Sequence, residues 1–214
     1  MRTIILGKEG SQPFKITADG VSRRHARITI SDAGDWTLED LNSSNGTFVR
    51  DEADGELTRV AKIGITPMTF ISLGPDNAKG CCFYARQALS ENYGNFTREY
   101  EYLNEKEEAF DQQEKALEQR VKTLRIAGPV AVIIFVFAIT GIPAFESLFG
   151  NNALQIRIAL SSLSGIIPVL YDGSAKKKAI GQLREKFHHC PNPLCTNKLK
   201  TSEIKNLRCS KCKK

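Results

Sequence analysis

The stretch ARITISDAGDWTLEDLNSSNGTFV, Ala26 to Val49, decides how the first part of this chain folds. Apolar and polar residues alternate in Ala26–Ile30 and again in Trp36–Glu39, as they do in strands with one buried face. The groups SDAGD and NSSNG, which are rich in turn-forming residues, follow these two runs. The stretch therefore predicts short, half-buried strands joined by turns.

The same texture extends over residues 3–86. Further short apolar runs (IIL, PFKI, MTFISL and CCFYA) are separated by turn residues, and no helical period occurs. Strands at this spacing predict an all-β sandwich, which we place at residues 1–90. Adjacent residues of a strand face opposite ways, so we interpret Cys81 and Cys82 as ordinary strand residues rather than ligands of one metal.

Charge divides the 214 residues unevenly. Residues 1–86 are neutral and residues 87–125 carry a net −3, whereas residues 126–214 carry 13 Lys and Arg against 4 Asp and Glu. A basic C-terminal part suits a membrane surface or an acidic partner. The N-terminus lacks the long apolar core of a secretory signal, so we expect a reducing compartment and cysteines that bind metal rather than form disulfides.

Residues 96–125 contain no Gly or Pro and are rich in helix formers, which predicts a helical stalk. One apolar column recurs every seven residues: Phe96, Leu103, Phe110, Leu117 and Leu124. The second column is incomplete, because Glu107 and Glu114 interrupt it. A coiled-coil homodimer and a single charged stalk both remain open.

Two apolar runs follow the stalk. Residues 126–145 hold no charge over about 30 Å of helix, enough to cross a bilayer, and predict a first transmembrane helix. Residues 153–171 predict a second one, although Arg157 interrupts the run and leaves a re-entrant or interfacial segment as the alternative. Basic residues flank both runs, which predicts a multi-pass hairpin in the cell membrane with both termini in the cytoplasm.

The tail, residues 185–214, contains two close cysteine pairs. Four, thirteen and two residues separate Cys190, Cys195, Cys209 and Cys212 in turn. This is the spacing of a tetrahedral four-thiolate zinc site, whose metal would supply the folding free energy of so short a segment. The tail resembles a zinc ribbon, with His188 or His189 as substitute ligands. The alternative is a flexible, lysine-rich tail with reactive thiols.

Three further motifs lie in predicted loops of the sandwich: Gly7-Lys8, the segment SRRH at 22–25, and SNGT at 44–47. Loops at one end of a sandwich can converge, and their hydroxyl groups, cations and N–H groups then form an anion site. In order and spacing these motifs resemble the forkhead-associated (FHA) domain family, a β-sandwich that binds phosphothreonine peptides.

The resemblance implies a role for each matching residue. The ligand contacts would come from Lys8, Ser22, Arg23, Ser44 and Asn45, in which the two serine hydroxyls meet the phosphate and Asn45 holds the peptide backbone. His25 would brace the loops from inside, and Gly7, Gly46 and Thr47 would be structural. The family has arginine where this chain has Lys8, and lysine lacks the planar fork that binds two phosphate oxygens together.

The motifs together favour a membrane-anchored adaptor without catalytic activity. Its expected partner is a protein that a Ser/Thr kinase has phosphorylated on threonine. We find no nucleophile–base pair and no glycine-rich phosphate loop, so an enzyme is disfavoured. Two alternatives remain: a scaffold subunit of a membrane complex whose FHA fold binds no phosphate, and a membrane-tethered nucleic-acid binder. The second is disfavoured because Phe187 is the only aromatic residue of the tail available for base stacking.

Overall fold

A computed structural model describes residues 1–75, 79–140, 150–162, 173–195 and 197–214. The chain forms two compact units. The first combines Met1–Glu108 with Leu183–Lys214, and the second is Ala109–Gln182. The first unit therefore contains both the predicted sandwich and the cysteine tail.

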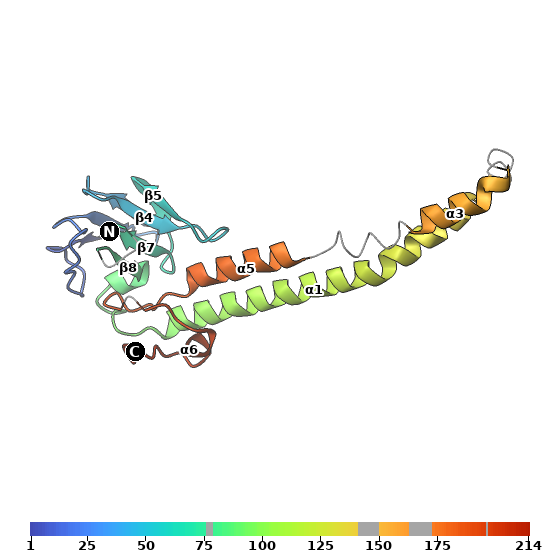
Figure 1. Cartoon of the computed structure of the whole chain (residues 1–214). Coiled ribbons are helices and arrows are strands. Elements are labelled where there is room, and N and C mark those ends of the chain that lie inside the picture. Colours follow the sequence, from blue (N-terminus) through green and yellow to red (C-terminus); the bar gives the residue numbers. More distant parts are fainter. Residues whose placement is uncertain (76–78, 141–149, 163–172, 196) are drawn as a thin grey trace. The chain divides into compact units, whose positions relative to one another are not determined.

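The sandwich consists of two four-stranded antiparallel sheets (Figure 1). The first has the order β1-β2-β3-β6, and the second has the order β5-β4-β7-β8. The strand bounds are β1 Arg2–Leu6, β2 Ala26–Ile30, β3 Trp36–Asp40, β4 Thr47–Arg50, β5 Leu57–Val60, β6 Lys62–Ile65, β7 Phe70–Leu73 and β8 Cys81–Tyr84. The prediction of an N-terminal β-sandwich is thus confirmed.

Strand register places the apolar residues of the first sheet in one row. Ile4 pairs with Ile28, and Ile28 pairs with Leu38, so all three point into the core, where at most 5% of each is exposed. On the opposite face Arg27 donates to Glu39 at 2.6 Å. The run PFKI also reaches the core, but it forms no strand. Phe14 packs edge-on against Phe83, with ring centroids 5.0 Å apart.

The outer face of the second sheet is covered by segments of the first unit that come later in the chain. All four residues of β7 are buried, because Ile71 and Leu73 face the core while Phe70 meets the tail on the other side. The guanidinium of Arg50 lies 3.7 Å from the centre of the Phe70 ring and donates to Nδ1 of His189 at 3.1 Å. This packing explains why the FISL strand lacks alternation.

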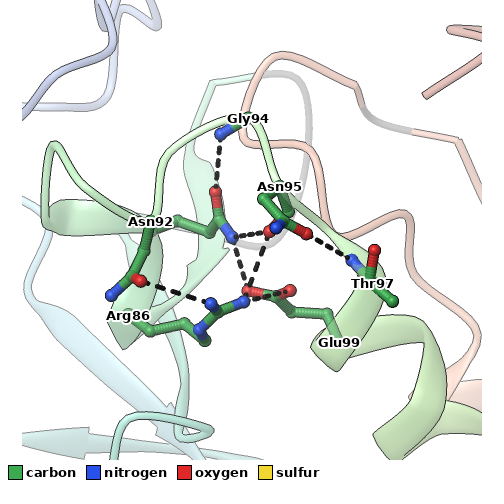
Figure 2. Close-up of polar contacts among 7 residues, drawn as sticks. Arg86, Asn92, Gly94, Asn95, Thr97 and Glu99 are labelled. Carbon is green, nitrogen blue, oxygen red and sulfur yellow. Dashed lines mark hydrogen bonds and ion pairs between the residues drawn. The ribbon is translucent and has the colours of Figure 1, made fainter.

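A buried polar cluster joins the sandwich to the helix that follows it (Figure 2). Arg86 lies in the 3-10 helix η1, Ala85–Ala88, and donates to Glu99 of helix α1 at 2.8 Å. Glu99 is fully buried, and Gln87 donates to its second oxygen. The side chains of Arg86 and Gln87 also donate to the backbone carbonyl of Asn95. The ion pair is therefore fully hydrogen-bonded, as a buried pair must be.

Helix α1, Thr97–Thr140, is a single 44-residue helix that contains the predicted stalk and most of the first apolar run. Its part up to Ala138 is long and apolar enough to cross a membrane. Residues 141–145 of the predicted span lie outside the described residues. Phe96, Tyr100 and Leu103 are buried within the first unit. These heptad positions are thus occupied within the chain, and the homodimer stays a prediction.

The remaining elements are shorter. They are the 3-10 helix η2 Gly150–Asn152, α3 Ala153–Ser162, α5 Ser174–Phe187 and α6 Thr201–Lys205. Helix α3 covers the start of the second predicted span, whose residues 163–171 lie outside the described part of the chain. The second span is therefore still a prediction.

Candidate functional site

His25 lies between two of the predicted ligand loops and bonds to both. Its Nδ1 accepts the N–H of Ser22 at 3.0 Å, and its Nε2 bonds the carbonyl oxygen of Gly46 at 2.9 Å. An acceptor at Nδ1 and a donor at Nε2 define one neutral tautomer. The ring is fully buried, so these two bonds join the loops from inside the domain.

The loop after β1 joins this arrangement through its backbone. The N–H groups of Lys8 and Glu9 donate to the carbonyl oxygens of Ser22 and Arg23, at 3.2 and 2.9 Å. Gly7 makes this approach possible. Its φ is 151°, and a Cβ atom there would lie 2.3 Å from the Arg23 carbonyl oxygen, so any other residue would push the two loops apart.

Asp40, at the end of β3, organises the turn at 42–46. One of its carboxylate oxygens accepts the hydroxyl groups of Ser43 and Thr47, both at 2.6 Å, and the other accepts the Ser43 N–H at 3.0 Å. Ser43 in turn accepts the N–H of Gly46. Thr47 is fully buried, and Gly46 has a φ of 83°, a left-handed conformation that favours glycine.

The structure brings the predicted ligand residues to the edge of these three loops. Ser22 accepts the backbone N–H of Ser44 at 3.2 Å through its hydroxyl oxygen, so the two serines predicted to contact phosphate are neighbours. Asn45 is exposed, and its amide donates to the carbonyl oxygen of Gly20 at 2.9 Å. Lys8 and Arg23 are exposed, and neither bonds a carboxylate among the described residues.

Two ionisable groups in the site have shifted pKa values. Burial lowers the pKa of His25, although the Gly46 carbonyl and Asp40 partly oppose this. For Asp40, burial alone would raise the pKa, but the hydrogen bonds from Ser43 and Thr47 outweigh it and the pKa is lowered. The loops are therefore held by a neutral imidazole and an ionised carboxylate at neutral pH.

Comparison with known proteins agrees with this geometry. Residues 4–63 match the family model of the FHA domain. The N-terminal domain is an FHA domain. No curated protein gives a significant match to the chain.

Solved FHA domains are among the similar structures. The FhaA FHA domain complexed with the intracellular domain of Rv3910 is 30% identical, and the match covers 37% of this chain and 78% of that one, with a TM-score of 0.29. An FHA domain solved in a study of phosphothreonine-dependent FHA interactions is 29% identical over 37% and 74%, also with a TM-score of 0.29. The FHA domain of the CT664 protein from Chlamydia trachomatis is 24% identical over 37% and 70%, with a TM-score of 0.28.

Sequence reasoning missed two residues of the FHA site. Asp40 precedes the loop by a spacing (Asp-x-x-Ser) that is typical of a side chain that caps a turn, and this signal was available. Arg59 of β5 lies over the turn: a Cβ on Gly46 would be 2.5 Å from its Nε. Arg59 follows Gly46 by thirteen residues, and nothing in that spacing indicates the contact.

The four cysteines of the tail form a second candidate site. Their sulfur atoms all lie within 4.8 Å of one another, and two of the pairs, 190–212 and 195–209, are 3.6 and 4.0 Å apart. A tetrahedral zinc ion with bonds of about 2.3 Å separates its sulfur ligands by about 3.8 Å, so the four atoms could bind a metal. This is the one such group among the residues that the structure describes.

The thiols differ in how easily they ionise: burial raises the pKa of Cys190 and of Cys195, whereas the surroundings of Cys209 favour its thiolate. Asn197 donates to Sγ of Cys209 at 3.4 Å. Burial alone would raise the pKa of Cys209, but the N–H groups of Cys212 and Lys211 and the Asn197 amide lower it to about 7. The two histidines have other partners, since His189 bonds Arg50 and His188 bonds Glu107. Between the cysteine pairs the described chain forms an isolated bridge and the short helix α6, so a ribbon fold is not confirmed.

Proposed function

We propose that this protein is a membrane-anchored adaptor, without catalytic activity, that binds threonine-phosphorylated proteins through its FHA domain. The observation that carries the proposal is the double hydrogen bond of His25, which fixes the loops at 20–25 and 42–46 to each other. A rigid edge with adjacent hydroxyl groups and unpaired cations needs no rearrangement to bind an anion, and preorganisation of this kind increases affinity.

Each ligand residue has a chemical task at this edge. The hydroxyl groups of Ser22 and Ser44 donate to phosphate oxygens, while Lys8 and Arg23 neutralise the dianion. A hydrogen bond to a charged group contributes about 1.5–3 kcal/mol, so three or four such contacts suffice for micromolar binding of a short peptide. The oxygen of Asn45 accepts a backbone N–H of the peptide and thus selects an extended chain beside the phosphate.

The partner that we propose is an intracellular protein phosphorylated by a Ser/Thr kinase. Two similar FHA domains support this. One was solved in a complex with an intracellular domain, and the other belongs to a study of phosphothreonine-dependent interactions.

The membrane anchor is the second part of the proposal. Ile126, Ile134 and Phe135 of α1 are each at least 63% exposed, a state that suits lipid better than water. We propose that the apolar part of α1 and the run at 153–171 form a hairpin, with the basic flanks and both termini in the cytoplasm. A cytoplasmic tail would keep its cysteines reduced, and we propose that Cys190, Cys195, Cys209 and Cys212 bind one zinc ion there.

A phosphopeptide library screened against the full-length chain in detergent tests the proposed function. We expect phosphothreonine peptides to bind and their unphosphorylated forms to be ignored. Arg23→Ala should weaken binding by about tenfold or more, the loss of one charge-assisted contact. The matched control is Arg24→Ala, because Arg24 is also exposed and adjacent but has no role in the site. If no phosphopeptide binds while membrane proteins still co-purify, the scaffold alternative is correct instead.

A further inference from the structure

Helix α1 and the beginning of α5 lie side by side in the second unit (Figure 1). Their side chains line an open groove. Its volume is about 520 Å³, and its wall is largely apolar, with Leu117, Val121 and Ile126 from α1. Gly173 lets the chain approach α1 closely here, since a Cβ on it would lie 2.8 Å from Cγ2 of Val121. The groove therefore has a defined apolar floor.

Cations surround this floor. Among the described residues, Lys122, Arg125 and Lys177 line the groove together with one carboxylate, that of Glu118. Lys177 forms an ion pair with Glu118 at 2.7 Å, so the negative charge of this carboxylate is already paired. Lys122 and Arg125 are exposed and bond no carboxylate among the described residues. Two positive charges thus remain for an anionic ligand.

The position of the groove along α1 fixes its depth relative to the proposed bilayer. Arg125 is the last charged residue before the apolar run, and Lys122 lies one turn earlier, about 5 Å along the axis. The polar headgroup layer on each side of a bilayer is of the same order, about 5–8 Å thick. If the apolar run starts at the hydrocarbon boundary, both cations lie at the level of the lipid phosphates.

We propose that this groove binds the headgroup of an anionic phospholipid of the cytoplasmic leaflet. The lipid phosphate pairs with Lys122 and Arg125, the start of its acyl chains covers Ile126 on the membrane side, and the glycerol headgroup extends toward Val121 and Leu117 on the aqueous side. This inference rests on the membrane anchor proposed above, but it is independent of phosphopeptide binding. A soluble anion would gain nothing from the apolar floor, and the described residues of the lining offer no aromatic ring on which a nucleobase could stack.

Native mass spectrometry of the full-length chain in nonionic detergent tests this proposal. Phosphatidylglycerol and phosphatidylcholine with the same acyl chains are titrated separately, and bound lipid is counted per chain. The groove variant is Lys122→Gln with Arg125→Gln. The matched control is Lys115→Gln with Arg120→Gln, which removes the same charge from exposed α1 residues outside the groove. Carbonate extraction of vesicles that contain each variant reports whether the chain is still inserted.

We expect the wild type to retain one phosphatidylglycerol in preference to phosphatidylcholine. The groove variant should bind it about thirtyfold more weakly, because two cations are lost, while the control keeps wild-type affinity. Equal losses in both variants, or equal binding of the two lipids, would overturn the site. Displacement of the lipid by free glycerol phosphate would also overturn it, because the ligand would then be a soluble anion. A chain extracted by carbonate refutes the anchor itself, whereas an inserted chain without lipid preference refutes only the groove.

Discussion

Replacement of His25 by alanine should both disorder the loops of the FHA site and lower the free energy of unfolding of the domain. The substitution removes the hydrogen bonds to Ser22 and Gly46, each of which contributes about 1 kcal/mol. The substitution leaves one of the two partner groups with another hydrogen bond and the other partner group without one. The Gly46 carbonyl keeps the N–H of Gly74 at 2.9 Å, but the Ser22 N–H loses the acceptor that the structure gives it. Desolvation of that one N–H adds about 1 kcal/mol, for a total near 3 kcal/mol.

A loss of this size is measurable. For a unit of this size, each kcal/mol lowers the melting temperature by about 3–5 °C, so His25→Ala should lower it by roughly 10 °C. The assay is thermal unfolding of the full-length chain in detergent, followed by fluorescence anisotropy with a labelled phosphothreonine peptide. Affinity should fall at least tenfold even well below the melting temperature, because Ser22 and Ser44 are no longer held together. The control, Arg24→Ala, should change neither quantity.

The pH dependence of stability provides an independent check. The pKa of His25 is lowered in the folded chain, mainly by burial, whereas the unfolded imidazole titrates near 6.5. Between these two values only the unfolded state takes up the proton, so the contribution of His25 to stability falls as the pH falls below about 6.5. His25→Ala should lack this component. An unchanged melting temperature, or an acid-induced loss equal in both proteins, would refute the bridging role of His25.

Further predictions concern the other sites. Lys8→Arg should tighten phosphopeptide binding by up to about tenfold, since the guanidinium restores a two-pronged contact, and calorimetry with one peptide checks this; weaker binding would mean that Lys8 does not meet the phosphate. Cys209→Ser should abolish a zinc content of about one ion per chain, measured by metal analysis, and retained metal would place the site elsewhere. Glu99→Gln should destabilise the first unit by about 3–5 kcal/mol in a melting experiment, because Arg86 is left as a buried charge without its carboxylate. A change below about 1 kcal/mol would contradict a buried Arg86–Glu99 ion pair. A cysteine probe at Asn152 should react with an external reagent in intact cells and one at Ser174 should not; labelling at Ser174 would contradict the hairpin.

The sequence predicted those parts of the fold that depend on local patterns. Alternation in ARITI and WTLE corresponds to β2 and β3, and the SRRH and SNGT motifs indicated the His25 bridge through the family resemblance. Strands β5 and β6 were missed as separate elements, because their burial does not alternate: Thr58 and Arg59 of β5, for example, are both exposed. The alternation rule assumes one buried face, and edge strands need not have one.

Contacts between distant segments could not be predicted in this way. Arg50 and His189 are 139 positions apart. Arg86 of η1 and Glu99 of α1 carry charges that look in the sequence like those of any solvated pair. Whether such a charge is exposed or buried depends on which face of the helix meets the sandwich. A single sequence carries no periodic signal for that choice. The heptad column shows the same limit, since its first members, Phe96 and Leu103, pack within the chain.

The tail packed on the FHA domain has a consequence for the order in which the protein is made. Residues 183–214 complete the first unit, yet they leave the ribosome after residues 109–182, a delay of about 4–15 seconds at about 5–20 residues per second. During that interval Phe70 and Arg50 lack the partners that His189 and Phe187 later provide. The nascent domain thus exposes an aromatic surface while the apolar part of α1 is already synthesised, which makes this interval the stage at which chaperones and misfolding would compete for it.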